Sequence, residues 1–253
     1  MSVLTLASGQ TFNTANLIAT DFVKPKKSKF NSMLVWQGPS VLNGEEIAVF
    51  ATLKSTNSKT GDMVQVSILR TDKAPLDAIK DGSDTAICGT CPHRRYTGGA
   101  CYVNVGQGPQ AIYKAFQRGN VSDYDIEAFR GRMVRFGSYG DPAAIPVHIM
   151  QAIASVAKGY TGYTHQLRHK NFDPRVLQFC QVSADSAKQA QAIQAKGHKT
   201  FRVKLESQPI LENEIECLAD AKGLSCLECG LCDGQKANIV INIHGSLKSR
   251  FKG

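Results

Sequence analysis

The chain of 253 residues has no apolar run approaching the length of about 18 residues that a membrane-spanning helix needs. No membrane partner is therefore expected. The first residues, MSVLTLASGQ, place no basic residue ahead of the apolar ones, so we predict no signal peptide. The expected compartment is a reducing cytoplasm, in which clustered cysteines favour metal binding over disulfide bonds.

A complete phosphate-binding loop is also missing. The stretch Ser58-Lys59-Thr60-Gly61 has residue types found at the end of such a loop. However, the glycine-rich spacing before it is absent, and the order is Lys-Thr-Gly rather than Gly-Lys-Thr. We therefore predict a hairpin turn at this position.

Acidic residues are in deficit, with 21 Asp and Glu against 30 Lys and Arg, which gives a formal net charge of +9. Metal-bound cysteines would be thiolates and would make the loaded protein less positive. A basic surface fits nucleic acid or another polyanion, and it fits an ordinary solvated surface equally well. The basic residues gather at Lys24, Lys26, Lys27 and Lys29, at Arg94 and Arg95, at 130–135 and at 248–252.

Seven of the eight cysteines fall into two groups. The first group is Cys88, Cys91 and Cys101, and the second group is Cys217, Cys226, Cys229 and Cys232. Two residues between cysteines let both sulfurs reach one ion, so both groups predict metal sites. His93 is a candidate for a fourth ligand in the first group, whereas Cys180, within an apolar strand, is expected to be a core thiol.

The identity of the metal stays open between two alternatives. The Cys-x2-Cys-x2-Cys run of the second group has the spacing of bacterial ferredoxin-type iron–sulfur loops. Four cysteines also suit a structural zinc ion. Three cysteines on a 4Fe–4S cubane cluster leave one iron free to bind another ligand, whereas four cysteines ligate all four irons. The two groups therefore fit an active-site cluster plus an accessory cluster, and also one zinc completed by His93 plus a second zinc.

The order of apolar and helical patterns predicts an α/β fold. Residues 1–31 are expected to form an extended arm, 32–82 a β-rich segment of antiparallel strands, and 83–253 an α/β domain with both metal sites. In the last part, strands that are apolar on both faces alternate with helices, as a buried parallel sheet requires. We expect a partial or distorted parallel α/β barrel, with an open α/β sheet as the alternative.

Polar residues follow the expected strands, where the sites of parallel α/β folds lie. Each also has a structural interpretation, because Asp and Ser favour turns and helix caps and a histidine can be satisfied within the fold. Asp141, His165 and Ser183 are the first catalytic candidates. The residues at strand ends are Ser138, Asp141, His165, Ser183, Asp185 and His244.

The chain resembles a family of uncharacterised tailed-bacteriophage proteins over most of residues 35–245. This resemblance implies a phage origin and action in the host cytoplasm, and it implies no particular activity. The shared motifs are Gly38-Pro39-Ser40 with Gly44, Ser58 to Met63, Ile87-Cys88-Gly89-x-Cys91, Cys101-Tyr102-Val103-Asn104, Gly137 to Pro142, Cys226 with Cys229 and Cys232, and His244-Gly245.

A looser resemblance is to radical SAM enzymes, in which a cysteine triad follows the first barrel strand and its last cysteine often precedes an aromatic residue, as in Cys101-Tyr102. It implies a 4Fe–4S cluster on the first group and an auxiliary one on the second. It also implies S-adenosylmethionine, contacted by Tyr102, Gly137, Ser138 and Gly140. The spacing here is Cys-x2-Cys-x9-Cys, whereas those enzymes usually have Cys-x3-Cys-x2-Cys.

Three hypotheses of function follow. The first is an iron–sulfur, radical SAM-like enzyme acting on a nucleotide, nucleic acid or peptide. The second is a zinc-stabilised protein that binds nucleic acid without catalysis, with Tyr96, Tyr102 and Tyr113 available for stacking. The third is a phage protein that binds a host protein.

Overall fold

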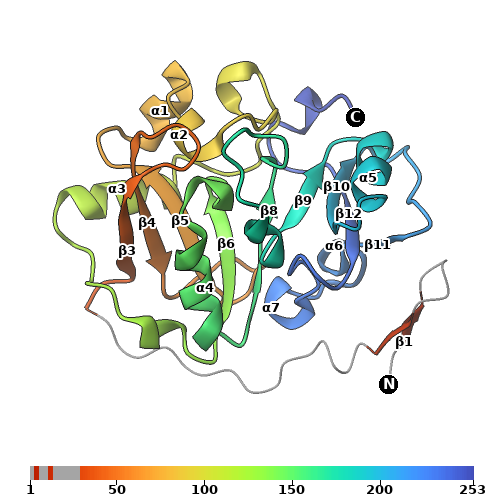
Figure 1. The fold of residues 1–253 in the computed structure, drawn as a ribbon, viewed down its shortest axis with the longest axis horizontal. Coiled ribbons are helices and arrows are strands. Elements are labelled where there is room, and N and C mark those ends of the chain that lie inside the picture. The colour runs from red at the N-terminus through yellow and green to blue at the C-terminus, as the bar shows by residue number, and fades with distance from the viewer. Residues whose placement is uncertain (1–2, 6–10, 14–28) are drawn as a thin grey trace.

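The computed structural model describes residues 3–5, 11–13 and 29–253, and this part of the chain forms a mixed α/β structure. It contains two five-stranded sheets, with the strand orders β3-β4-β5-β6-β7 and β11-β12-β10-β9-β8 (Figure 1). The predicted α/β class is confirmed. The strands of the two sheets are β3 (Ser32–Pro39), β4 (Glu46–Thr52), β5 (Val64–Arg70), β6 (Met133–Tyr139), β7 (Gly159–Thr161), β8 (Tyr163–Thr164), β9 (Gln181–Ala184), β10 (Thr200–Lys204), β11 (Glu214–Glu216) and β12 (Asn238–Asn242).

Seven α-helices lie between or beside the strands in the described residues. None of them combines the length and apolar character that a membrane crossing requires. They are α1 (Pro75–Asp81), α2 (Thr85–Cys88), α3 (Gly108–Gln117), α4 (Val147–Val156), α5 (Ala187–Gln194), α6 (Leu218–Lys222) and α7 (Cys226–Cys229).

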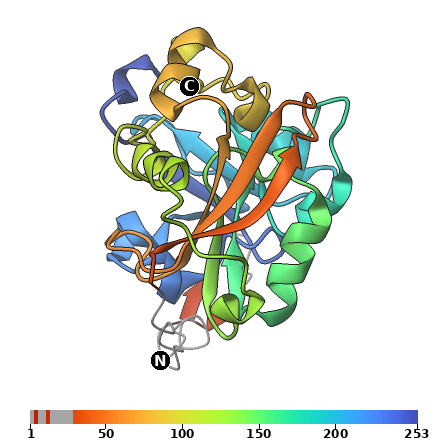
Figure 2. The same ribbon diagram turned by 90° about the vertical axis from the view of Figure 1, so that its left-hand side faces the viewer.

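The first sheet begins with the predicted antiparallel meander, because β3 pairs with β4 and β4 with β5 in antiparallel fashion. Figure 2 shows β3 and β4 in front, with the segment of α1 and α2 above them and α4 to one side. Residues 47–51 of β4 are buried in succession, so both faces of this strand are covered. Burial of a side chain such as Phe50 contributes about 1.5–3 kcal/mol, and Phe116 of α3 packs edge-on against it at 5.2 Å.

From β5 onward the strands run parallel. β5 pairs with β6 and β6 with β7, and in the second sheet every pair is parallel. The crossover from β5 to β6 carries α1, α2, the first cysteine group and α3. The predicted division after residue 82 therefore falls inside one sheet. The carboxyl ends of parallel strands lie at one edge, which brings the residues that follow β5, β6, β8 and β9 together.

Gly162 connects the two sheets. The sequence predicts one strand at Gly159 to Gln166, but β7 pairs within the first sheet and β8 within the second. Between them, the Gly162 N–H donates to the carbonyl oxygen of Cys232 at 3.0 Å, and the Gly162 carbonyl accepts from the N–H of Gln181 at 2.9 Å. A Cβ at this position would lie 2.6 Å from the sulfur of Cys180, so only glycine fits. Cys180 is 1% exposed, as expected for a core thiol.

Two further segments differ from expectation. The sequence predicts a strand that begins at Val176, but β9 begins only at Gln181. The reason is that Pro174–Gln178 form a 3₁₀ helix whose first turn is capped by the side chain of Asp173. The short strand β11 was not predicted at all. It adds to the free edge of β12, and its three residues are too few to show a periodic pattern.

The predicted N-terminal arm, residues 1–31, lies for the most part outside the described residues. Within it, β1 (Val3–Thr5) and β2 (Thr11–Asn13) pair in antiparallel fashion. The basic residues Lys24, Lys26 and Lys27 lie outside the described residues.

Candidate metal centres and the adjoining cavity

The first cysteine group lies at the carboxyl ends of the parallel strands. Cys88 ends α2, and its carbonyl oxygen accepts a hydrogen bond of 2.9 Å from the side-chain amide of Gln166, which follows β8. The oxygen of the same amide accepts from the N–H of Thr90 at 3.1 Å. The N–H of Asp141, just after β6, donates to the carbonyl of Ile87 at 2.6 Å. The cysteine loop is therefore fixed to the ends of β6 and β8.

Asp141, a predicted catalytic residue, is 7% exposed and has both carboxylate oxygens occupied. One accepts the N–H of Ala143 at 3.0 Å, and the other accepts the N–H of His165 at 2.8 Å and the amide of Gln166 at 3.3 Å. Burial raises the pKa of the Asp141 carboxyl above its ordinary value, although the hydrogen bonds from Ala143 and His165 oppose the rise. This geometry makes Asp141 a residue that holds its neighbours in position.

The glycine turn after β6 brings two strands close together. Gly140 has φ +82°, and a Cβ there would lie 2.9 Å from the Cβ of Ile68 in β5. Gly137 has φ +70°, and a Cβ there would lie 2.7 Å from the ring of Pro142 and 2.8 Å from the carbonyl oxygen of Gly140. Ser138, between them, donates to the side chain of Gln65 at 2.7 Å. The two predicted cofactor-binding glycines therefore have a backbone role, whereas the hydroxyl of Ser138 is engaged by Gln65.

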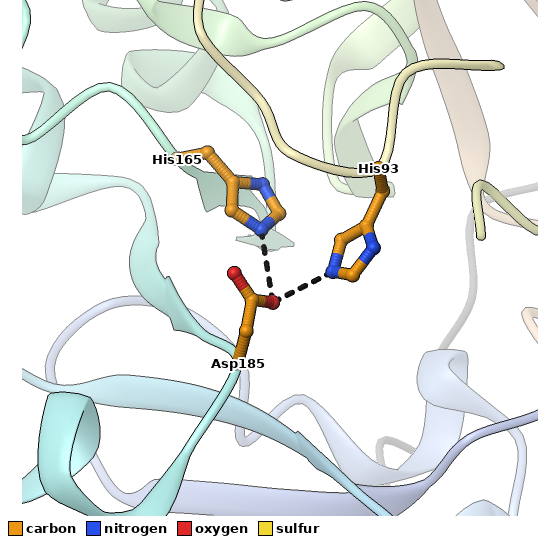
Figure 3. Close-up of side chains that lie close together, drawn as sticks. All are labelled: His93, His165 and Asp185. Carbon is orange, nitrogen blue, oxygen red and sulfur yellow. Dashed lines mark hydrogen bonds and ion pairs between the residues drawn. The ribbon is translucent and has the colours of Figure 1, made fainter. Parts of the chain in front are cut away.

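Two histidines and one carboxylate, His93, His165 and Asp185, lie close together, as Figure 3 shows. The Nε2 atom of His93 lies 2.7 Å from Oδ1 of Asp185, and Nε2 of His165 lies 3.5 Å from the same oxygen. The other ring nitrogen of His165, Nδ1, is 3.4 Å from the sulfur of Cys91. His93 follows the first cysteine pair, His165 follows β8, and Asp185 follows β9. The topology thus joins three polar residues that are up to 92 positions apart.

The charges in this cluster stabilise one another. Burial alone lowers the pKa of the His165 ring, but the neighbouring Cys91 and Asp185 raise it well above its ordinary value. Burial raises the pKa of the Asp185 carboxyl, but hydrogen bonds from His165 and His93 outweigh this and hold it below its usual range.

The second cysteine group is held by the turn between β4 and β5, where the sequence predicts a hairpin turn at Ser58 to Gly61. The N–H groups of Cys226 and Leu227 donate to the carbonyls of Lys59 and Thr60 at 2.9 and 3.1 Å. Lys59 also forms an ion pair of 3.2 Å with Asp220 of α6. The predicted turn is confirmed, and it anchors α7. The first turn of α7 is closed by a capping box between Ser225 and Glu228.

All four cysteines of the second group line one cavity of about 420 Å³. Tyr102 and Ser138, both predicted to bind a cofactor, line it as well. Ser183, a predicted catalytic residue, is paired in register with Phe201, which lines the cavity, so the two share a face of the sheet. His244, which follows β12, is a further wall residue.

Arg135 of β6 is one of the cations that line this cavity, and Lys59 is another. Arg135 donates a hydrogen bond of 2.6 Å to the hydroxyl of Tyr102, and its guanidinium lies 5.5 Å from the ring centroid of Tyr163. Phe201 also lines the cavity, and its ring centroid lies 4.3 Å from that of Tyr163. A cavity that combines aromatic rings with a guanidinium suits a planar or anionic ligand.

The thiols within each group interact electrostatically. Burial raises the pKa of Cys88, and Cys91 and Cys101 raise it further. Burial, with smaller contributions from Cys217 and Cys226, raises the pKa of Cys229 to about 11. A metal would have to displace protons from these thiols, as metal binding to cysteine generally does.

The spacing of the sulfurs can be compared with the spacing that a single zinc ion requires. One zinc ion holds its thiolates at about 2.3 Å, which places four sulfurs about 3.8 Å from one another. Among the described residues, the set of three possible ligand atoms that all lie within 4.8 Å of one another is His93, His165 and Asp185, and no set of three cysteines meets that distance. All eight thiols are free. The sulfurs of either group would therefore have to lie closer together than in this structure to share one zinc ion.

No family model matches the chain, and no significant similarity to a curated protein or to a solved structure was found.

The sequence does not identify several of the residues that form the site. Gln166 and Arg135 carry no motif, and their roles depend on what the fold brings near them. His93 was considered as a ligand of the first group, but its ring faces Asp185 instead. The one usable signal was position, since His165 and Asp185 each directly follow a parallel strand.

Proposed function

We propose that the chain is an iron–sulfur enzyme of radical SAM-like plan, encoded by a phage and acting in the host cytoplasm. In this proposal Cys88, Cys91 and Cys101 hold a 4Fe–4S cluster with one open iron. The second group holds an accessory cluster.

The observation that carries the proposal is the position of the first cysteine group. Its loop follows β5, the first strand of the parallel series, and hydrogen bonds from Asp141 and Gln166 hold it over the ends of β6 and β8. A cluster on three cysteines would leave one iron open to a ligand, and Tyr102, which follows Cys101, lines the cavity. By contrast, the second group has four cysteines, which would leave no iron of a cluster open, and hydrogen bonds to the turn at Lys59 hold α7 in place.

The proposal includes a partial parallel barrel. Two observations support it. Gly162 carries the hydrogen bonding from one sheet to the other. At the far edge, the ring of Tyr102 lies 5.1 Å from that of His244, measured between centroids, so the loop after β5 meets the residues after β12.

When bound, a cluster with one open iron can bind a cofactor and supply it with an electron. The chain's own residues would do the rest. Asp141 and Gln166 hold the loop in place, Ser138 and Tyr102 offer hydroxyl groups, and Arg135 offers a cation to a carboxylate or phosphate. The aromatic walls at Tyr163 and Phe201 favour a nucleotide or a nucleic acid base over an aliphatic peptide side chain.

Calorimetry with S-adenosylmethionine tests this function on the anaerobically purified protein. We expect micromolar binding, and cleavage of S-adenosylmethionine when a reductant is added. Cys101→Ser should abolish cleavage. An iron-loaded protein that neither binds nor cleaves S-adenosylmethionine would refute the radical SAM assignment and leave the clusters as electron carriers.

A second candidate, nucleic-acid binding without catalysis, is favoured by exposed aromatic residues near basic ones. Tyr96 and Tyr102 are 57% and 46% exposed. Arg95 adjoins Tyr96 in the chain. Such a surface can stack on bases while cations contact phosphates. Binding to random single-stranded RNA or DNA that weakens steeply with salt, without any binding of S-adenosylmethionine, would favour this candidate.

A further inference from the structure

We infer that His93, His165 and Asp185 form a binding site for a single first-row divalent metal ion such as Fe²⁺ or Mn²⁺, which adjoins Cys91 but takes no ligand from either cysteine group. The inference does not depend on the proposed function, because it concerns different ligand atoms and a different metal class.

The donor atoms already lie close to the required spacing. Ligands about 2.1 Å from one ion, at angles between octahedral and tetrahedral, lie roughly 3.0–3.5 Å apart. In the structure, two imidazole nitrogens lie 2.7 and 3.5 Å from one oxygen of Asp185, and all three ligand atoms lie within 4.8 Å of one another. Figure 3 shows both rings directing these nitrogens at the same carboxylate.

A hydrogen-bonded cluster alone explains this arrangement less well. The 2.7 Å contact of His93 is a good hydrogen bond, but the 3.5 Å contact of His165 is long for one. One carboxylate oxygen facing two imidazole nitrogens is the arrangement that an ion between them would produce.

The surroundings of the cluster resemble those that orient metal ligands in general. A ligating histidine usually has its second ring nitrogen engaged. Here Nδ1 of His165 faces the sulfur of Cys91 at 3.4 Å, and the backbone N–H of His165 donates to Asp141. The backbone N–H of Asp185 donates to the side chain of Gln189 at 2.8 Å.

The site is open on one side. The side chains of His93, His165 and Asp185 are 17%, 20% and 21% exposed. Two imidazoles and one carboxylate leave the remaining coordination positions of an ion free for water or a small ligand, and this donor set is the one that holds Fe²⁺ in non-haem iron oxygenases. We therefore assign the site to an ion with exchangeable positions rather than to a closed structural ion.

Mn²⁺ is the probe that separates this site from the cysteine groups, because it prefers oxygen and nitrogen ligands and binds thiolates poorly. The experiment follows the electron paramagnetic resonance signal of free Mn²⁺ during titration of the full-length protein. We expect one Mn²⁺ per chain. Asp185→Ala and His93→Asn should each weaken binding at least about tenfold, since each removes one of three ligands. His148→Asn, on an exposed position of α4, is the matched control and should bind as the unaltered protein does.

Two results would overturn the inference. One is the absence of Mn²⁺ binding by the unaltered protein. The other is binding by His93→Asn and Asp185→Ala that equals that of the control. His93 lies in a loop, so its variant should fold even if Asp185→Ala does not. Cys101→Ser should lose iron at the adjacent first group and keep Mn²⁺ binding, and the double variant Cys226→Ser, Cys229→Ser should do the same for the second group, which separates this site from both proposed clusters.

Discussion

The side-chain amide of Gln166 donates a hydrogen bond of 2.9 Å to the carbonyl oxygen of Cys88. Gln166 has no exposed surface, and its amide oxygen accepts from Thr90 at the same time. One buried side chain thus fixes Cys88 and Thr90, within the first cysteine pair, to the end of β8. It acts together with the local turn, in which the N–H of Cys91 donates to the carbonyl of Cys88.

Replacement of Gln166 by Leu should therefore disturb the first group selectively. It removes the hydrogen bonds to the Cys88 carbonyl and from the Thr90 N–H, each of which contributes about 0.5–1.5 kcal/mol. Chemical unfolding should show a loss of stability in this range, and iron analysis should show partial loss that spares the second group. Gln117→Leu, on the exposed end of α3, is the control. Equal iron content and stability in the two variants would contradict this role.

The two cysteine groups should respond differently to loss of one ligand. Cys229→Ser removes one of the four thiolates proposed to hold a metal between α7 and the second sheet, so the melting temperature should fall clearly. Cys101→Ser removes a ligand from a loop that hydrogen bonds also hold, so its melting temperature should change less while activity is lost. Cys180→Ala removes a thiol outside both groups and should leave the metal content unchanged. An unchanged melt for Cys229→Ser would rule out a structural second site.

The sequence was informative where a pattern is local. The alternation in β3 to β5 predicted the meander, and the grouping of cysteines identified both candidate sites. It was uninformative where geometry depends on distant residues. The change from one sheet to the other at Gly162 requires glycine because the sulfur of Cys180 lies beside it. The hydrogen bond between His93 and Asp185 forms because the order of the strands brings the two residues together. The hydrophobic periodicity of neighbouring residues predicts neither contact.

Gly61 should be intolerant of a side chain. It has φ +67°, and a Cβ would lie 2.9 Å from the Cβ of Leu227 in α7. Gly61→Ala should combine backbone strain of about 1–2 kcal/mol with displacement of α7, so both stability and metal content at the second group should fall. Gly44→Ala is the matched control, since Gly44 has φ +82° with no atom within 4 Å of the added Cβ. It should lose stability only, and equal loss of metal in both variants would disprove the anchoring of α7 by this turn.

The buried ion pair of Arg202 and Glu214 should matter for the second sheet. The guanidinium of Arg202 contacts both oxygens of Glu214, at 2.7 and 2.6 Å, and these side chains are 1% and 0% exposed. Arg202→Met leaves a buried carboxylate without its partner and should cost about 3–5 kcal/mol. The double variant Arg202→Met, Glu214→Leu should recover much of this loss. Urea unfolding measures both; a double variant no more stable than the single one would show that the pair is not the cause.

The most direct test of the account is metal and sulfide analysis of anaerobically purified protein, together with its visible spectrum. Two 4Fe–4S clusters predict a brown protein with about eight iron and eight sulfide per chain. A colourless protein with about two zinc ions, one for each cysteine group, would contradict the iron–sulfur assignment and make both groups structural.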